Sequence, residues 1–455
     1  MAPTGGGQAQ YRMHGARCSI ISTRPGVAPA VWLSEPGAQQ RGRQAMSSTE
    51  ESRRRARLRR DSQQWAFDRL VNETGRVFHW QQKGRGRLPE GVKMHAMISK
   101  HVGRAAQRLE QLAKAEAAAG HDLTALEFYF DAAFAFANAQ HTVFALDDEK
   151  KYLHGSVLRC YDEVRRLASY TIEKVDIPWE GTTVSGYLHL ADVAGPAPLI
   201  FFIPGCDMTK EMVPHPLYNF ATQRGMHLFV FDGPGQGESN MRGIKLTVDN
   251  YERAASAALT HLLERPDVDA DRIGMYSLSF GSYWGVRFAA TDDRIAAAAI
   301  IWASICDKYY LFEEESPRYK QLFAFLTQAA SEAELDEFVA GMSVEDFMAR
   351  IGCPTLVTIG QYDPRSPVDE VYDMFDLLQA PAELWVFEDQ HHNTNLKASF
   401  ATQWLGDHHS MTMDWLGDRL AGKPIVSPGE TKWLAANGVS PNDSRVPRQR
   451  SWFDA

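Results

Sequence analysis

The feature of this sequence that most constrains its fold is a series of short apolar runs that alternate with helical stretches. Each run has the length and continuous apolar character of a buried strand, and the runs lie at residues 198–203, 227–231, 272–276, 295–302, 355–359 and 383–387. Helical patterns separate most of them, at residues 217–223, 248–263, 283–290 and 368–378. Strands that alternate with helices predict an α/β fold with a mostly parallel central sheet and helices on both faces.

The region before these runs has a different, helical pattern. Apolar side chains recur at helical spacing between residues 123 and 137, in a segment rich in Ala and Phe. We expect residues 61–170 to form a helical domain, and residues 171–422 to form a catalytic domain that opens with a hairpin turning at Gly181.

Both ends of the chain differ from these two domains. The first fifty residues are rich in Gly, Pro, Gln and Arg and have no periodic apolar face. We expect residues 1–60 to be a disordered extension, with the natural start near Met46. Residues 423–455 are polar and rich in proline, which predicts a loosely attached C-terminal tail.

Composition excludes several classes of function. The net charge of −9 is unlike the basic surplus of a nucleic-acid-binding domain. No apolar run reaches eighteen residues, so we expect no membrane span. The five cysteines are scattered without C-x-x-C spacing, which favours reduced thiols in a cytoplasmic protein and predicts no metal site. We expect no cofactor; the oligomeric state, including a homodimer, stays open.

The segment 274–282 joins a predicted strand to a predicted helix and contains two serines that could act as a nucleophile. A nucleophile on such a sharp turn needs small residues two positions before and two after it. Ser279 has Ser277 and Gly281 at these positions, whereas Ser277 would have the bulky Met275. Ser279 is therefore the predicted nucleophile, although Ser277 stands where glycine is usual.

An acid and a base follow at the ends of later strands. Asp363 comes after the run 355–359, and His391 and His392 come after the run 383–387. The order Ser, acid, His resembles that of α/β-hydrolases, in which the histidine takes the serine proton and the acid orients the histidine. We predict Asp363 as the acid and prefer His391 as the base, with His392 as the alternative.

Two backbone amides are candidates for the oxyanion hole. One is the N–H of Phe280, directly after the nucleophile, and the other is the N–H of Cys206, in the loop after the run 198–203. Gly205 permits that loop to turn its amides inward. The glycine-rich segment 232–237 lacks the lysine of a phosphate-binding loop, so we interpret it as a tight turn beside the active site.

Three segments together resemble the 2,6-dihydroxypseudooxynicotine hydrolase and fermentation-respiration-switch-like esterase branch of α/β-hydrolases, which includes fungal polyketide-shortening pigment hydrolases. They are residues 205–211 (Gly-Cys-Asp-Met-Thr-Lys-Glu), 232–237 (Asp-Gly-Pro-Gly-Gln-Gly) and 279–281 (Ser-Phe-Gly). The resemblance implies an α/β-hydrolase fold with an N-terminal helical cap over the site, as the pattern Gly-His-x-x-Thr-Ala-x-Glu-x-Tyr at 120–129 also suggests. It also implies cleavage of a C–C bond in a β-dicarbonyl-like compound or of an ester.

Some members of this branch use a further glutamate, for which Asp307 and residues 313–315 are candidates here. We favour the interpretation that the run 313–315 is a solvated part of a lid, and that Phe128, Phe130 or Phe134 lines the pocket.

The leading hypothesis is a serine hydrolase that acts on an activated carbonyl of a small organic molecule. A biosynthetic acyltransferase or cyclase on the same fold is one alternative, and a non-catalytic binding protein on a hydrolase scaffold is another. Product analysis with an acceptor alcohol or amine separates the first, and labelling with a fluorophosphonate probe separates the second.

Overall fold

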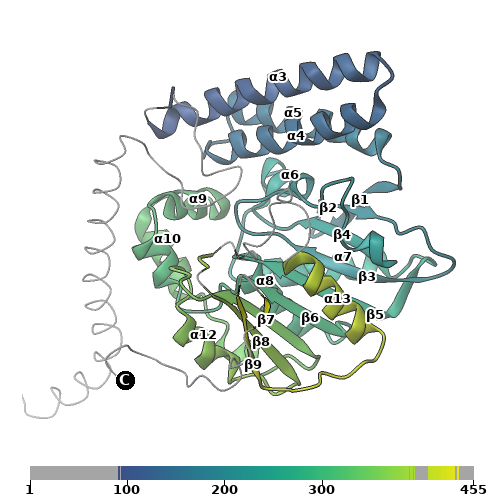
Figure 1. The fold of residues 1–455 in the computed structure, drawn as a ribbon. Helices are drawn as coiled ribbons and strands as arrows, with labels where there is room; N and C mark the ends of the chain where they lie inside the picture. The colour runs from purple at the N-terminus through teal and green to yellow at the C-terminus, as the bar shows by residue number, and fades with distance from the viewer. Residues whose placement is uncertain are drawn as a thin grey trace, which may run out of the picture. The chain divides into compact units, whose positions relative to one another are not determined.

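The computed structural model describes residues 91–92, 94–388, 390–392, 394, 408–435 and 438–439 (Figure 1). The predicted N-terminal extension and the natural start near Met46 lie outside these residues. Within the ranges described, no helix combines the length and the apolar character that a membrane crossing requires.

The described part of the N-terminal region is helical, as predicted, while residues 61–90 of the expected helical domain lie outside the described ranges. After a 3-10 turn, η1 (His95–Met97), come three long helices, α3 (Ile98–Ala118), α4 (Asp122–His141) and α5 (Asp148–Leu167), which lie together in Figure 1. Their shared core contains Leu126, Phe130 and Phe136 from α4 and Val157 and Tyr161 from α5. This helical region therefore has its own apolar interior rather than resting entirely on the sheet.

The remainder of the described chain forms a ten-stranded sheet in the order β1-β2-β4-β3-β5-β6-β7-β8-β9-β10. Its strands are β1 (Ile172–Trp179), β2 (Thr182–His189), β3 (Ala197–Ile203), β4 (His227–Asp232), β5 (Val268–Leu278), β6 (Ala297–Ile301), β7 (Thr355–Gly360), β8 (Ala382–Phe387), β9 (Thr431–Ala435) and β10 (Gly438–Val439). Along the sheet from β4 through β3 to β9 all neighbours pair in parallel. The pairs β1–β2, β2–β4 and β9–β10 are antiparallel. The predicted mostly parallel sheet is confirmed.

Helices cover both faces of the sheet, and neighbouring residues of one strand pack on opposite faces. Phe201 lies on the face covered by α7 (Asn250–Leu262), α8 (Gly281–Thr291) and α12 (Val368–Phe375). Phe202 lies on the other face, in a core that includes residues of α13 (His408–Leu420). This explains why β3 reads as a continuous apolar run: both faces are buried.

Three features differ from the sequence prediction. The helix expected at 217–223 is reduced to a 3-10 turn, η3 (Thr222–Arg224). Between β6 and β7 the chain makes an excursion that was not predicted, consisting of a π-helical turn, η4 (Tyr310–Glu314), and helices α9 (Arg318–Thr327), α10 (Glu332–Ala340) and α11 (Glu345–Met348).

The third difference is the C-terminal boundary. Residues 431–435, placed in a loose tail by the sequence argument, form β9 and pair in parallel with β8. Lys432 of β9 pairs with the buried carboxylate of Glu383 on β8. This ion pair and the backbone ladder attach the strand to the sheet, so the boundary expected at residue 422 is wrong.

Candidate active site

Ser279 lies on a sharp turn between β5 and α8, in a backbone conformation that few residues with a side chain adopt. Its φ angle is +57°, and its N–H donates to the carbonyl of Ile301 at 2.8 Å. A Cβ on Gly281 would lie 2.5 Å from the carbonyl oxygens of Ile203 and Pro204, so only glycine fits there. The close approach of β3 to the start of α8 thus enforces the small residue that the sequence argument required.

The neighbouring serine, Ser277, faces the protein interior. It is fully buried, and its Oγ donates to the carbonyl of Ala299 at 3.2 Å. A Cβ on Gly285 of α8 would lie 2.5 Å from the Ser277 side chain, so the helix and the strand are in close contact at these two residues.

A hydrogen-bonded chain of three side chains starts at Ser279. Its Oγ lies 2.7 Å from Nε2 of His392, and Nδ1 of the same ring lies 2.7 Å from Oδ2 of Asp363. Asp363 follows β7 and is 3% exposed, and its Oδ1 accepts the N–H of Arg365 at 2.9 Å. Three residues from the ends of three strands are therefore brought together in the geometry that a serine nucleophile and its base need.

The histidine preferred from the sequence, His391, is not the one beside Ser279. It is exposed, and its Nδ1 lies 3.0 Å from the carbonyl oxygen of Tyr362. A Cβ on Gly360 would lie 2.1 Å from the carbonyl oxygen of His391, so the backbone of His391 rests against the end of β7. This contact turns the side chain of His391 outward and that of His392 inward.

Trp302, which the sequence analysis did not single out, packs beside His392. It follows β6 with a φ of +51°, and the centroids of its ring and of the His392 ring are 5.9 Å apart. Its Nε1–H donates to Thr394 Oγ1 at 2.7 Å, two residues beyond the histidine. Trp302 therefore holds the loop after β8 from one side. In the sequence it is marked only by its position, as the aromatic residue at the end of the apolar run 295–302.

Two side chains of the acidic run 313–315 are buried rather than solvated, contrary to the interpretation favoured from the sequence, whereas that of Glu313 is 29% exposed. Glu314 is buried, and the carboxylate of Glu315 pairs with the guanidinium of Arg365 at 2.9 Å, with both side chains at least 93% buried. Because the N–H of Arg365 binds Asp363, this ion pair supports the loop that carries the acid. A member of a charge run can thus be buried when it has a partner of opposite charge.

Cys206 and Phe280, the two predicted oxyanion donors, lie on either side of Ser279. Phe280 directly follows Ser279 at the start of α8, where backbone N–H groups are not used within the helix. Cys206 follows Gly205, and a Cβ on Gly205 would lie only 3.3 Å from the Cβ of Ser279. The absence of a side chain at Gly205 lets the loop 205–209, named here the oxyanion loop, approach the serine.

The glycine-rich segment after β4 supports the oxyanion loop. Gln236 donates its Nε2–H to the carbonyl of Gly205 at 2.8 Å, and its Oε1 accepts the hydroxyl of Tyr251 at 2.6 Å. The segment thus lies beside the oxyanion loop, near where the sequence argument expected it. The supporting role of Gln236 was not predicted.

A buried cluster of charges fixes the end of the oxyanion loop. Lys210, in the 3-10 turn η2 (Lys210–Met212), is completely buried, and its Nζ lies 2.6 Å from Glu211, 2.9 Å from Asp232 and 3.0 Å from Glu238. Burial alone would lower the pKa of Lys210, but attraction to Asp232, Glu211 and Glu238 raises it well above its ordinary value. The lysine therefore stays charged and ties the loop to the end of β4.

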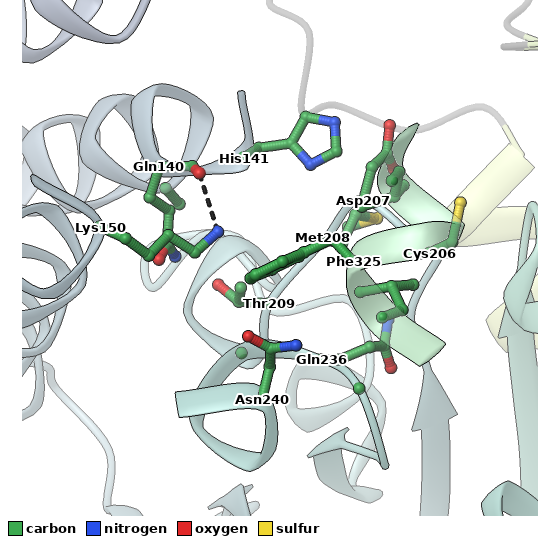
Figure 2. A pocket seen from close by; sticks show the side chains of 15 residues that line it. Gln140, His141, Lys150, Cys206, Asp207, Met208, Thr209, Gln236, Asn240 and Phe325 are labelled. Atoms are coloured by element: carbon green, nitrogen blue, oxygen red, sulfur yellow. Dashed lines mark hydrogen bonds between the residues drawn. The ribbon is translucent and has the colours of Figure 1, made fainter. Parts of the chain in front are cut away.

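A small pocket lies between the helical region and the oxyanion loop (Figure 2). From α4 and α5 it is lined by Ala137, Gln140, His141 and Lys150; none of Phe128, Phe130 and Phe134 is among its lining residues. On the other side it is lined by the oxyanion loop, α9, and the short helix α6 (Gly237–Met241) with the residues just before it. The helical region thus forms one wall of a cavity that reaches Cys206.

Comparison with known proteins places this geometry in a family. The sequence model of the family described as "Esterase FrsA-like" matches residues 105–370, which is more than half of the chain. The chain is 30% identical over 335 residues to a 2,6-dihydropseudooxynicotine hydrolase of Paenarthrobacter nicotinovorans, covering 72% of this chain and 86% of that protein. It is 26% identical over 334 residues to the Hydrolase LUC6 of a Fusarium species, covering 62% of this chain and 79% of that one.

A solved structure gives the same result. The crystal structure of a 2,6-dihydroxy-pseudo-oxynicotine hydrolase superposes with a TM-score of 0.63 and 26% identity, covering 75% of this chain and 92% of that one. The fold and the extent of these matches agree with the resemblance inferred from residues 205–211, 232–237 and 279–281. The chain belongs to the FrsA-like esterase family and is an enzyme of the α/β-hydrolase class.

Proposed function

We propose that this chain is a serine hydrolase in which Ser279 is the nucleophile, His392 the general base and Asp363 the residue that orients the histidine. The observation that carries the proposal is the pair of 2.7 Å contacts joining the three side chains. The strained turn at Ser279 supports it, because such strain is commonly stored at functional sites.

In the proposed reaction, Oγ of Ser279 attacks the substrate carbonyl carbon while its proton passes to Nε2 of His392. The carboxylate of Asp363 stabilises the imidazolium that forms, and the N–H groups of Cys206 and Phe280 bind the developing oxyanion. His392 then gives its proton to the leaving group, and a water molecule, activated by the same histidine, releases the acyl group and restores Ser279.

The substrate is proposed to be a small organic molecule with an activated carbonyl. The family resemblance of residues 205–211, 232–237 and 279–281 favours cleavage of a C–C bond next to a second carbonyl, where the leaving carbanion is stabilised as an enolate. Membership in an esterase family favours ester cleavage, in which the leaving group is an alkoxide or phenoxide. Both reactions pass through the same kind of oxyanion.

The helices α3, α4 and α5 are proposed to act as a cap domain, residues 61–170, over a catalytic domain that extends from residue 171 through β9. The support is that α4 and α5 line the pocket opposite the oxyanion loop. A cytoplasmic location is also proposed; Cys160, Cys306 and Cys353 carry free thiols, which fits a reducing compartment.

Turnover of two substrate series by the wild type and a Ser279→Ala variant tests the proposal. The series are p-nitrophenyl esters of increasing acyl length and aryl β-diketones, with products identified by mass spectrometry. We expect activity in at least one series, a loss of at least a thousandfold in Ser279→Ala, and fluorophosphonate labelling of the wild type at Ser279 only. Undiminished turnover by Ser279→Ala would contradict the proposal.

A further inference from the structure

The pocket beside the oxyanion loop contains polar atoms that are not used in the described part of the chain. Both amide atoms of Asn240, on α6, and the hydroxyl of Thr209 are buried without a hydrogen-bond partner there. The two residues are 3% and 9% exposed. Gln236, which lines the same pocket, has both of its amide atoms bonded. Buried polar groups are usually satisfied, so three unused atoms facing one cavity indicate a missing partner.

Lys150, on α5, adds a buried cation to the same pocket. Its Nζ donates to the carbonyl of Gln140 at 2.8 Å and lies 4.9 Å from the centre of the Phe325 ring. Among the residues that the structure describes, no carboxylate comes within ion-pair distance of it, whereas Lys210 has three. Burial lowers the pKa of Lys150 to about 8. A buried ammonium group without a counter-ion is costly unless a ligand supplies the negative charge.

These groups come from separate elements and face a shared space. In Figure 2 the side chains of Lys150, Thr209 and Asn240 surround the cavity from α5, from the oxyanion loop and from α6. Asp207, an acidic residue that lines the pocket, has its Oδ2 3.6 Å from Nη1 of Arg318, so its charge is offset. The local balance therefore favours an anion over a cation.

We propose that this pocket binds an anionic oxygen group of the substrate, a carboxylate being the simplest case, through Lys150, Thr209 and the Nδ2–H of Asn240. The inference rests on the proposed function, because Cys206 both lines the pocket and is the proposed oxyanion donor. A substrate whose carbonyl oxygen lies at Cys206 and Phe280 extends from there into the pocket. Lys150, Thr209 and Asn240 are thus specificity-determining residues.

Matched pairs of neutral and carboxylate-bearing esters test this subsite. For the acyl side, p-nitrophenyl half-esters of glutaric to suberic acid are compared with p-nitrophenyl alkanoates of the same length. For the leaving group, 4-carboxyphenyl hexanoate is compared with phenyl hexanoate. In one of these series we expect the wild-type kcat/KM to be at least tenfold higher for the carboxylate, and this ratio to fall at least tenfold in Lys150→Met.

Lys151→Met is the matched control, because Lys151 is the next residue of α5 and its side chain is 62% exposed. We expect it to keep the wild-type ratio, whereas Asn240→Leu and Thr209→Val lower it. Equal ratios in the wild type and Lys150→Met, in both series, would overturn the subsite while leaving ester hydrolysis by Ser279 intact.

Binding to the Ser279→Ala variant gives a readout that does not depend on turnover. Titration calorimetry measures the binding of adipate and hexanoate, with hexanamide as the neutral comparison. We expect both carboxylates to bind at least tenfold more weakly to the double variant Ser279→Ala/Lys150→Met than to Ser279→Ala. If the wild type cleaves neither the esters nor the aryl β-diketones but this binding is present, the proposed function fails and the subsite stands. Carboxylate binding no stronger than that of hexanamide would refute the subsite.

Discussion

Gln236 holds Gly205 in place: its side-chain amide donates to the carbonyl of Gly205 at 2.8 Å, and Gly205 packs against the Cβ of Ser279. A side chain in one loop therefore fixes the distance between the proposed nucleophile and a proposed oxyanion donor in another. Small displacements of such donors have large effects on rate, because stabilisation of the transition state depends on their geometry.

The variant Gln236→Leu removes this hydrogen bond while keeping a side chain of similar size. We expect kcat to fall by about 10- to 100-fold, with a smaller change in KM, since the donor is displaced rather than deleted. Steady-state kinetics with a p-nitrophenyl ester measures both constants. Gln379→Leu, at an exposed position, is the control and should behave as wild type. A change in KM alone would show that Gln236 acts on substrate binding.

Separate replacement of the two adjacent histidines tests their different placement. His392→Ala should lower kcat about 10⁴-fold, because the group that takes the serine proton is lost. His391→Ala should retain activity within a few-fold of wild type, because its side chain is exposed and its ring lies beside Tyr362 rather than beside Ser279. Equal losses in the two variants would contradict the assignment of His392 as the base.

The turn after Ser279 should tolerate no side chain at residue 281. Gly281→Ala would place a Cβ 2.5 Å from two backbone carbonyl oxygens that cannot move easily, so we expect a loss of about 2 to 3 kcal/mol in unfolding free energy. Gly155→Ala, on the exposed face of α5 with nothing within 4 Å, should instead stabilise the protein by up to about 1 kcal/mol. Chemical denaturation of both variants gives the comparison.

Acid sensitivity of the fold should depend in part on His189. This residue of β2 is fully buried, with its Nδ1 3.1 Å from the hydroxyl of Tyr170, and burial lowers its pKa to about 3. Between pH 6.5 and about 3 the unfolded chain binds a proton at His189 that the folded chain does not, so stability falls as the pH falls through this window.

The variant His189→Phe should reduce that fall by up to about 1.4 kcal/mol per pH unit, the value for one proton. Unfolding free energies measured at pH 6.5, 5.5 and 4.5 provide the slope. His261→Gln, at a histidine whose side chain is 41% exposed, is the control. An unchanged slope in His189→Phe would show that the residue is protonated within the folded state.

Much of the fold was predictable because its strands are buried on both faces and therefore appear as unbroken apolar runs. Asp363 and the histidine pair were found for a related reason: the carboxyl ends of parallel strands meet at one edge of the sheet. The choice between His391 and His392 depends on how the backbone of His391 rests against Gly360 at the end of β7. A contact between two loops distant in sequence leaves no local pattern.

The features that were missed depend on partners far away in the chain. The run 313–315 looks like a solvated segment until Arg365 is placed beside Glu315. The strand β9 is short, and the ion pair between Lys432 and Glu383 of β8, which helps attach it to the sheet, cannot be inferred from the local sequence. The pocket residue Lys150 likewise belongs to an ordinary-looking polar helix, and only the packing of α5 shows that it is buried.

The pocket has walls of two different origins, and this has a consequence for engineering. The reacting groups sit on loops of the sheet, whereas Gln140 and Lys150 project from α4 and α5, which have their own core. A chimera that receives these helices from a relative would therefore exchange one side of the cavity and leave the reaction centre untouched. The contribution of Lys150 to selectivity would move with these helices, whereas Thr209 and Asn240 would stay with the sheet.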